Sequence, residues 1–243
     1  MSGIAWRLRV LPEAPSTSDT LASLAVEGAP EGTAVLARRQ TAGRGRAGRG
    51  WESPGGNLHL SVLLRPDRPP RDAPLFGLTA AVALADAAAA VLPGDAPVRL
   101  KWPNDLMLGD AKAGGILAEA DATPEGRIAR LILGIGVNLA AAPVLPGRAT
   151  ACLASFAAPP DPVAFAGTLL EALGRRLSQL AAAGFAPIRD AWLARGPAIG
   201  SEVLVRGVAG SLAGRFAGLA GDGSLLLYRD RETVAVTAGE VGA

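Results

Sequence analysis

A segment rich in glycine and arginine, residues 41–56, separates two apolar stretches near the start of this chain. It holds six glycines and three arginines and has no apolar periodicity, so it can form the core of neither a helix nor a strand. The stretch before it, 34–37, is short and apolar, and the stretch after it, 57–65, alternates like a strand. The sequence therefore predicts two strands of a sheet joined by a long glycine-rich loop.

Further elements follow from the apolar spacing along the chain. Ser16 to Asp19 form an N-cap signal before a helical run, and the alanine-rich residues 75–92 predict a helix that ends at Pro93-Gly94. Two more helices are expected at 162–183 and 188–194, and strands at 98–102, 112–119 and 128–138.

The pattern changes near Gly196. From Gly200 onward, short alternating stretches are separated by glycine turns, which predicts a small barrel-like β module of about 45 residues. We therefore expect one domain over 1–196 and a second over 197–243.

Composition excludes several classes of protein. The formal net charge of +2 is too small for broad nucleic-acid binding, and a single cysteine, Cys152, allows no intramolecular disulfide. No stretch has the form of a signal peptide or of a membrane span, since the Ala-rich residues 80–92 are too few and include Asp86. We expect a cytoplasmic protein without a membrane partner. His59 and Cys152 are expected to be structural, although the side chain of His59 could point to the side of the sheet that binds a ligand.

The glycine-rich loop is the first motif that carries chemistry. Its glycines let backbone N–H groups approach an anion, and Arg44, Arg46 and Arg49 add charge suited to phosphate. No Gly-Lys-Ser/Thr follows, so it is not a Walker A loop, and no helical pattern follows, so it is not a Rossmann fingerprint. A flexible, solvated basic loop or a nucleic-acid-binding arginine–glycine segment stays open as an alternative.

Two further motifs lie downstream. Lys101-Trp102-Pro103-Asn104-Asp105 precedes Lys112, and a lysine there could neutralise charge between a carboxylate and an α-phosphate, with Asn104 or Asp105 positioning nucleotide or Mg²⁺. A tight turn with solvated lysines would explain the same residues. Glycines within 134–138 indicate close approach of a ligand or of another backbone, with plain strand packing as the alternative.

In their joint order these motifs resemble the biotin–protein ligase family. The matching residues are Gly43 to Arg49, Trp51, Ser53-Pro54, Asn57-Leu58, Lys101 to Leu106, Lys112, Gly115 to Leu117, and Gly134, Gly136 and Asn138. The resemblance runs from about Ser16 to the C-terminus and is weakest after Gly196. It implies an α+β fold, in which a central mixed β-sheet with flanking helices is followed by a small SH3-like β domain.

The resemblance also implies the reaction. Biotin reacts with ATP to give biotinyl-5′-AMP, and the biotinyl group passes to a lysine of a biotin carboxyl carrier protein, with Mg²⁺ as cofactor. Lys112 and Arg46 are the expected catalytic residues. The expected biotin-binding residues are Ser16, Thr17, Ser18, Gln40, Arg44, Gly45, Arg46, Lys112 and Gly115. The expected nucleotide-binding residues are Arg44, Arg46, Arg49, Trp51, Lys101, Asn104, Asp105 and Asn138, and no metal ligand is assigned.

The chain departs from the family pattern at two positions. Ser18 stands where relatives have Asn, and Ala47 stands where many have a basic residue. Because only 15 residues precede Ser16, we expect neither the winged helix-turn-helix of repressor relatives nor DNA binding. A lipoate–protein ligase and a nucleic-acid-binding protein are the alternative functions. A homodimer is compatible with the sequence, which does not set the oligomeric state.

Overall fold

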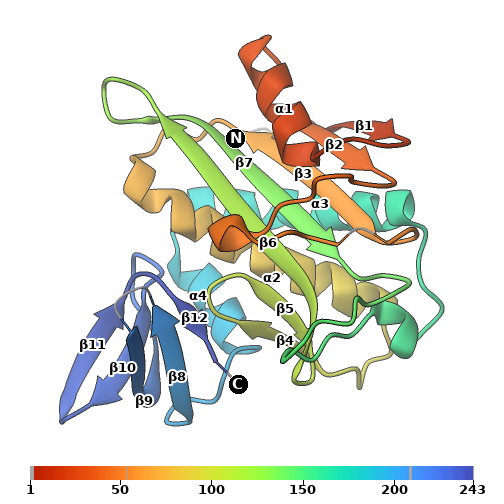
Figure 1. Ribbon diagram of the computed structural model, residues 1–243. Coiled ribbons are helices and arrows are strands. Elements are labelled where there is room, and N and C mark those ends of the chain that lie inside the picture. The colour runs from red at the N-terminus through yellow and green to blue at the C-terminus, as the bar shows by residue number, and fades with distance from the viewer. Residues whose placement is uncertain (1–2, 53, 208–209, 243) are drawn as a thin grey trace.

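The computed structural model describes residues 3–52, 54–207 and 210–242 (Figure 1). Its main body is a seven-stranded sheet of order β1-β2-β3-β7-β6-β5-β4. The pair β1–β2 is parallel and the other neighbouring pairs are antiparallel, which confirms the expected mixed sheet. The strands are β1 (Arg7–Leu11), β2 (Thr33–Ala37), β3 (Leu58–Leu64), β4 (Val98–Lys101), β5 (Asp105–Leu108), β6 (Ala111–Ala122) and β7 (Ile128–Val137).

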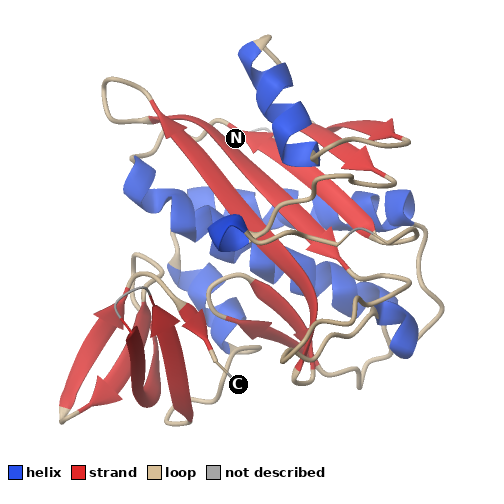
Figure 2. Ribbon diagram, in the orientation of Figure 1, coloured by secondary structure: helices blue, strands red, loops and turns tan. Residues whose placement is uncertain are grey.

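Helices cover the two faces of this sheet unequally (Figure 2). Helix α1 (Thr17–Val26) packs on β2, β3 and β7 at one face. Helices α2 (Ala73–Val91) and α3 (Pro162–Ala183) cover the other face, and α4 (Ala186–Leu193) packs against both of them. Short 3₁₀ turns lie at Arg46–Gly48, Pro70–Asp72 and Leu153–Ser155. Since α1 is only 10 residues long, much of its face is left to loops.

The alternation of β3 assigns its side chains to these two faces as the sequence predicts. Leu58, Leu60 and Leu64 belong to the large core beneath α2 and α3. Leu63 belongs to a separate small core beneath α1. Side chains of a strand point alternately to opposite faces, so the odd-numbered residues of β3 all face the side that α1 and the glycine-rich loop share.

Two strands of the seven-stranded sheet are absent from the sequence-based prediction, and so is the short β12 (Glu240–Val241) of the C-terminal sheet. β1 lies at the sheet edge and its charged, half-exposed residues give no clear alternation. β5 has four residues, Asp105–Leu108, and begins two residues after Pro103, where the sequence indicated only a turn. It forms because Leu106 and Leu108 pair with β4 on one side and Leu106 with β6 on the other. Its existence thus depends on strands on both sides of it.

Residues 70–91 have the length and mean hydropathy, 1.7, of a membrane-spanning helix. However, 61% of this window is buried within the protein, where α2 packs against the sheet and against α3. The apolar character of α2 is therefore that of a central core helix.

The C-terminal residues form a five-stranded antiparallel sheet of order β11-β10-β9-β8-β12, as the β module predicted from the sequence requires. Its apolar side joins the main core, with the rings of Phe216 and Trp192 6.2 Å apart. Trp102 Nε1 also donates to the Gly223 carbonyl at 3.1 Å. The strands are β8 (Glu202–Gly207), β9 (Gly210–Leu219), β10 (Leu225–Arg229), β11 (Glu232–Val236) and β12 (Glu240–Val241). The boundary expected at 196/197 falls between α4 and β8 and stays a prediction.

Candidate active site

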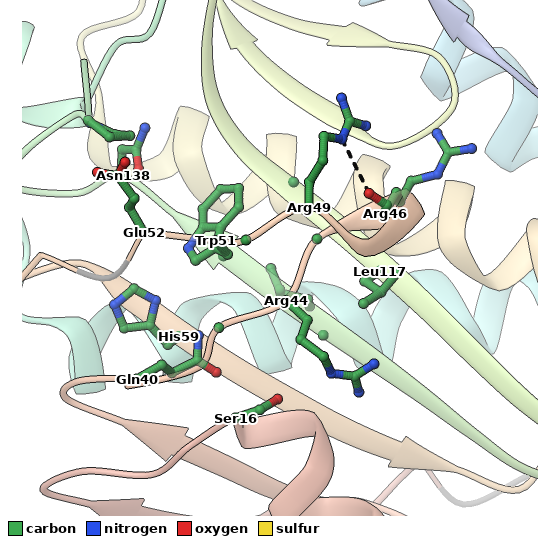
Figure 3. Close-up of a pocket in the computed structure, with 18 of the residues that line it drawn as sticks. Ser16, Gln40, Arg44, Arg46, Arg49, Trp51, Glu52, His59, Leu117 and Asn138 are labelled. Atoms are coloured by element: carbon green, nitrogen blue, oxygen red, sulfur yellow. Dashed lines mark hydrogen bonds between the residues drawn. The ribbon is translucent and has the colours of Figure 1, made fainter. Parts of the chain in front are cut away.

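A cavity of about 1110 Å³ opens on the sheet face that α1 leaves uncovered (Figure 3). It is bounded by the start of α1, by the glycine-rich loop, by β3, β6 and β7, and by residues 143–150. The cavity is large enough for a cofactor-sized ligand. Glycines at the centre of its floor keep it open, because Gly115 and Gly136 lie opposite each other on β6 and β7, next to Lys112 and Trp51.

Side chains of other segments pack directly against the floor glycines, so no larger residue fits at these positions. A Cβ on Gly136 would lie 2.5 Å from the indole of Trp51, and one on Gly134 would lie 2.7 Å from Ser18 Oγ. Both distances are too short for a side chain. The glycines of 134–138 indicated close approach of a ligand or of another backbone, whereas in the structure the groups nearest to Gly134 and Gly136 are the side chains of Ser18 and Trp51.

Hydroxyl groups gather at the end of the cavity beneath α1. Ser16 caps α1 by accepting from the Asp19 N–H, while Thr17 and Ser18 point into the protein and are buried. Thr17 Oγ1 lies 2.8 Å and Ser18 Oγ 3.0 Å from Ser61 Oγ. The side-chain oxygen of Gln40 accepts from the Thr17 backbone N–H at 2.8 Å. Hydroxyls both donate and accept, so this cluster can pair with a small polar group of a ligand.

The glycine-rich loop folds over the cavity as a compact turn. The Gly45 N–H donates to the Arg49 carbonyl at 2.7 Å, and the Trp51 N–H donates to the Gly43 carbonyl at 2.9 Å. Ala47 has φ +55°, a left-handed conformation that is uncommon for a residue with a side chain. The loop is thus ordered by its own backbone hydrogen bonds.

Arginine side chains of this loop have different partners. Arg44 donates to Glu119 and to Asp19, and these contacts, the hydrogen bond to Glu119 first, raise the pKa of Arg44. Arg49 pairs with Glu240, and that hydrogen bond lowers the pKa of Glu240 to about 2. Arg46 donates to Asn104 Oδ1 at 3.2 Å, and burial lowers its pKa. Arg46 is consequently the arginine without a carboxylate ion pair among these three.

Lys112 supplies a second cation at the floor of the cavity. Its Nζ lies 2.5 Å from Asp105 Oδ1 and 5.8 Å from the centroid of the Trp51 ring. Burial lowers the pKa of Lys112, and the carboxylate of Asp105 partly offsets this effect. A cation in such a place can attract and orient an anionic substrate.

The structure brings most of the predicted site residues to this one cavity. Those that line it are Ser16, Thr17, Ser18, Gln40, Arg44, Gly45, Arg46, Arg49, Trp51, Asn104, Lys112, Gly115 and Asn138. Asp105 lies behind Lys112, and Lys101, opposite Asp105 in the β4–β5 register, also lies outside the lining. The roles assigned to all of these residues remain predictions.

Several residues of the site were not singled out from the sequence. Ser61 is the hydrogen-bond partner of Thr17 and Ser18, and its place on the odd-numbered side of β3 was the available signal. Ser61 is fully buried and is not itself part of the cavity lining. Arg148 and Glu240 do line the cavity, and Arg148 Nη2 lies 3.4 Å from Glu240 Oε2. No local pattern marks these two, because the chain brings them in from distant segments.

Buried polar atoms without hydrogen bonds gather here as well. In the part of the chain that the structure describes, such atoms belong to four residues, namely Trp51, His59, Asn138 and Trp192. The first three line the cavity. Buried polar atoms are nearly always hydrogen-bonded in folded proteins, so these atoms are candidates to bind a ligand. No three side chains of His, Cys, Asp or Glu among the described residues could together hold a metal ion.

These features define a class of protein before any comparison is made. A phosphate-type loop closes over a buried lysine, and a hydroxyl cluster lies at the other end of the same cavity. Charge of this kind stabilises a carboxylate while it reacts with a nucleotide phosphate. The arrangement is that of a ligase that activates a carboxylic acid.

Comparison with known proteins identifies the family. Residues 10–138, just over half of the chain, match the model of the biotin/lipoate A/B protein ligase family, and the chain belongs to this family. A biotin–[acetyl-CoA-carboxylase] ligase of Paracoccus denitrificans is 38% identical over 222 residues, which are 85% of this chain and 88% of the relative. One from Mycobacterium tuberculosis is 36% identical over 99% of this chain and 90% of its own length.

A solved structure agrees with the whole fold. The biotin protein ligase of Aquifex aeolicus in complex with biotin and ATP superimposes with a TM-score of 0.82 and 26% sequence identity, covering 97% of both chains. The match includes the C-terminal sheet, so the two-part architecture is that of a biotin protein ligase.

Proposed function

We infer that this chain is a biotin protein ligase, which activates biotin with ATP to biotinyl-5′-AMP and transfers the biotinyl group to a lysine of a biotin carboxyl carrier protein. The observation that carries the inference is the pairing of a buried cation, Lys112, with the hydroxyl cluster at the far end of one cavity. Biotin has a carboxylate at one end and a polar ureido ring at the other. The cavity offers a suitable partner for each end.

The ring end of biotin is proposed to lie beneath α1. The hydroxyls of Thr17, Ser18 and Ser61 are buried and already in contact with one another. A ligand that replaces or joins their hydrogen bonds therefore costs little side-chain entropy on binding. Ser18 fits here without the larger amide of the family pattern, because its Oγ already reaches Ser61 at 3.0 Å. Gln40, held by Thr17, completes this end.

The reacting end is proposed to lie between Lys112 and Arg46. A carboxylate oxygen of biotin attacks the α-phosphorus of ATP, the bond from the α-phosphorus to the bridging oxygen breaks, and pyrophosphate leaves. Lys112 orients the carboxylate, and Arg46, which has no carboxylate partner of its own, neutralises charge on the α-phosphate. No covalent enzyme intermediate is required. The amine of the carrier lysine then attacks the mixed anhydride, loses a proton and releases AMP.

Mg²⁺ is part of the proposal as the ion that accompanies ATP. It prefers oxygen ligands and is commonly held by one or two carboxylates together with substrate phosphates. The described residues fit this mode, since no dedicated cluster of ligands exists and Asp105 lies next to Lys112. ATP would therefore supply most of the oxygen ligands, and Asp105, which lies outside the cavity lining behind Lys112, would reach the ion only through water.

The nucleotide is proposed to lie on the side of Trp51 and Asn138. Trp51 Nε1 is a buried donor and Asn138 Oδ1 a buried acceptor, and both lack partners among the described residues. A purine edge carries donors and acceptors that could pair with them. Arg49 and Arg148 both pair with Glu240 on this side of the cavity, so their two positive charges exceed its single negative charge.

A lipoate ligase is the related alternative. The dithiolane ring of lipoate has no hydrogen-bonding group to match Thr17, Ser18 and Ser61, so the hydroxyl cluster favours biotin. A carrier domain is incubated with the protein, ATP and Mg²⁺, and with either biotin or lipoate, and is then weighed by mass spectrometry. A mass gain from biotin alone supports the proposal, and a gain from lipoate alone would replace it.

The partner is proposed to be the carrier domain of acetyl-CoA carboxylase or of another biotin-dependent carboxylase. We also propose that the enzyme works in the cytoplasm and does not bind DNA, which titration with duplex DNA at low salt would test.

β1 is an edge strand on which Val10 is 41% exposed, so a second copy could pair there. Light scattering at several concentrations would establish whether a homodimer forms.

A further inference from the structure

His59 is the only histidine of the chain and lies in β3, on the face that lines the cavity. It is 1% exposed, and neither ring nitrogen makes a hydrogen bond of normal geometry with the described residues. A buried polar group without a partner costs about 1–3 kcal/mol. Such a cost is unexpected for a residue whose only task is to fill space, since an apolar side chain would do this without it.

The register of the sheet places His59 within the cavity floor. It lies opposite Gly136, while Ser61, two residues further along β3, lies opposite Gly134. Residues two apart on a strand are about 6.6 Å apart and share a face. The imidazole is therefore next to the hydroxyl cluster along β3, and Figure 3 labels its ring, together with Gln40 and Trp51, among the residues that line the cavity.

The imidazole is neutral under ordinary conditions. Burial lowers the pKa of His59 to about 4, against a smaller opposing effect of the Pro54 carbonyl. A neutral imidazole has one N–H donor and one acceptor nitrogen. Unlike a phenylalanine, it can therefore pair with either a donor or an acceptor of a ligand without introducing charge.

We propose that His59 is a biotin-binding residue, whose neutral imidazole hydrogen-bonds to a polar atom of the bound biotin moiety. The inference rests on the proposed function. Biotin is favoured because His59 shares its strand and its face with Ser61, the partner of Thr17 and Ser18. Its register partner Gly136 lies under Trp51, so the measurement with ATP alone tests the nucleotide as the other ligand. The ligand would satisfy nitrogens that the free protein leaves unpaired.

The single histidine makes a direct test available. Untagged protein is labelled with ¹⁵N-histidine, so that every imidazole signal comes from His59. Spectra are recorded for the free protein, with saturating biotin alone and with ATP and Mg²⁺ alone, while calorimetry measures binding of each ligand. We expect biotin alone to shift at least one ring nitrogen and ATP alone to leave both in place.

The outcomes separate the two claims. If calorimetry shows biotin binding but the imidazole signals do not move, or if only ATP moves them, His59 is not a biotin-binding residue and the proposed function stands. If biotin does not bind and the carrier gains no mass, the proposed function and this inference both fail.

Variants of His59 give a second measurement. We expect His59→Leu to weaken biotin binding roughly three- to tenfold, as for the loss of one neutral hydrogen bond, and to leave the ATP dissociation constant unchanged. His59→Gln keeps a donor and an acceptor, so it should recover part of the affinity. Biotin affinity of His59→Leu equal to or above that of the wild type would overturn the proposal.

Discussion

The ammonium of Lys112 lies 2.5 Å from the carboxylate of Asp105, at a place where both side chains are largely withdrawn from water. Their exposed fractions are 15% and 10%. The same ammonium adjoins Gly115 and Trp51, both in the cavity lining. Asp105 thus contacts the Lys112 ammonium on the side away from the cavity, and the opposite side of the ammonium faces the cavity.

Removing this cation should impair the first reaction step. We expect Lys112→Gln to slow adenylate formation by about 10²- to 10³-fold, the range for loss of a group that stabilises transition-state charge, and Arg46→Gln to act similarly. Pyrophosphate release in a single turnover measures the step. Arg175→Gln, the same loss of charge on the exposed side of α3, serves as the control. A near-normal rate for Lys112→Gln would remove its assigned role.

The rate of adenylation should also decline at high pH. The protonated form of Lys112 is the active one, so activity is lost as pH rises through its pKa, which burial lowers from 10.5. The charge of Asp105 raises this pKa, so Asp105→Asn should move the alkaline limb to lower pH. The measurement is a pH–rate profile of single-turnover adenylation for both proteins. A limb that stays in place or moves upward would show that Lys112 is not the titrating group.

In the free protein, Arg44 should fix the position of the glycine-rich loop through ion pairs rather than bind a phosphate. It ties the glycine-rich loop to Asp19 of α1 at 2.6 Å and to Glu119 of β6 at 2.8 Å. These side chains are 36–56% exposed, so each pair is worth less than about 1 kcal/mol. We expect Glu119→Gln to speed biotin dissociation in stopped-flow experiments by about 1.5- to fivefold. Glu171→Gln on α3 is the matched control. An unchanged rate for Glu119→Gln would argue against this role of Arg44.

A methyl group on the cavity floor should displace Trp51. The Cβ of Gly136→Ala would lie 2.5 Å from the indole, whereas Gly94→Ala adds a methyl group with no atom within 4 Å. We expect the first variant to shift the tryptophan emission that Trp51→Phe removes, and to weaken ATP binding. The second variant should change neither. Identical spectra and ATP affinities for Gly136→Ala and wild type would contradict the packing described.

An ion-pair cluster remote from the cavity should contribute to stability. Asp86 of the core helix α2 accepts from Arg176 Nε at 2.8 Å and lies 3.0 Å from Arg195 Nη2. Asp86→Ala leaves two partly buried guanidinium groups without this partner. We expect the free energy of unfolding in urea to fall by about 1.5–3 kcal/mol. Asp190→Ala, whose side chain is 71% exposed, should cost far less, and equal losses would refute the assignment.

The sequence predicted much of the fold because local patterns report burial. Helix α3 has the predicted bounds, 162–183, since its apolar residues recur with the helical period and Asp161 caps its first turn. The alternation of β3 likewise assigned its leucines and its polar residues to the correct faces. β1 and β5 were missed, because an edge strand and a four-residue strand depend on their neighbours for their formation.

The family resemblance carried by the joint order of the motifs predicted residues that lie around one cavity, from Ser16 and Gln40 to Lys112, whereas each motif alone left a structural explanation open. Only the tertiary structure decided their partners. It paired Arg49 with Glu240 across 191 residues and Ser61 with Thr17 across 44, and it left His59 in the cavity lining without a hydrogen bond of normal geometry to the described residues. Periodicity and motif order are local properties of a chain, whereas contacts between distant segments depend on how the whole sheet and its loops pack.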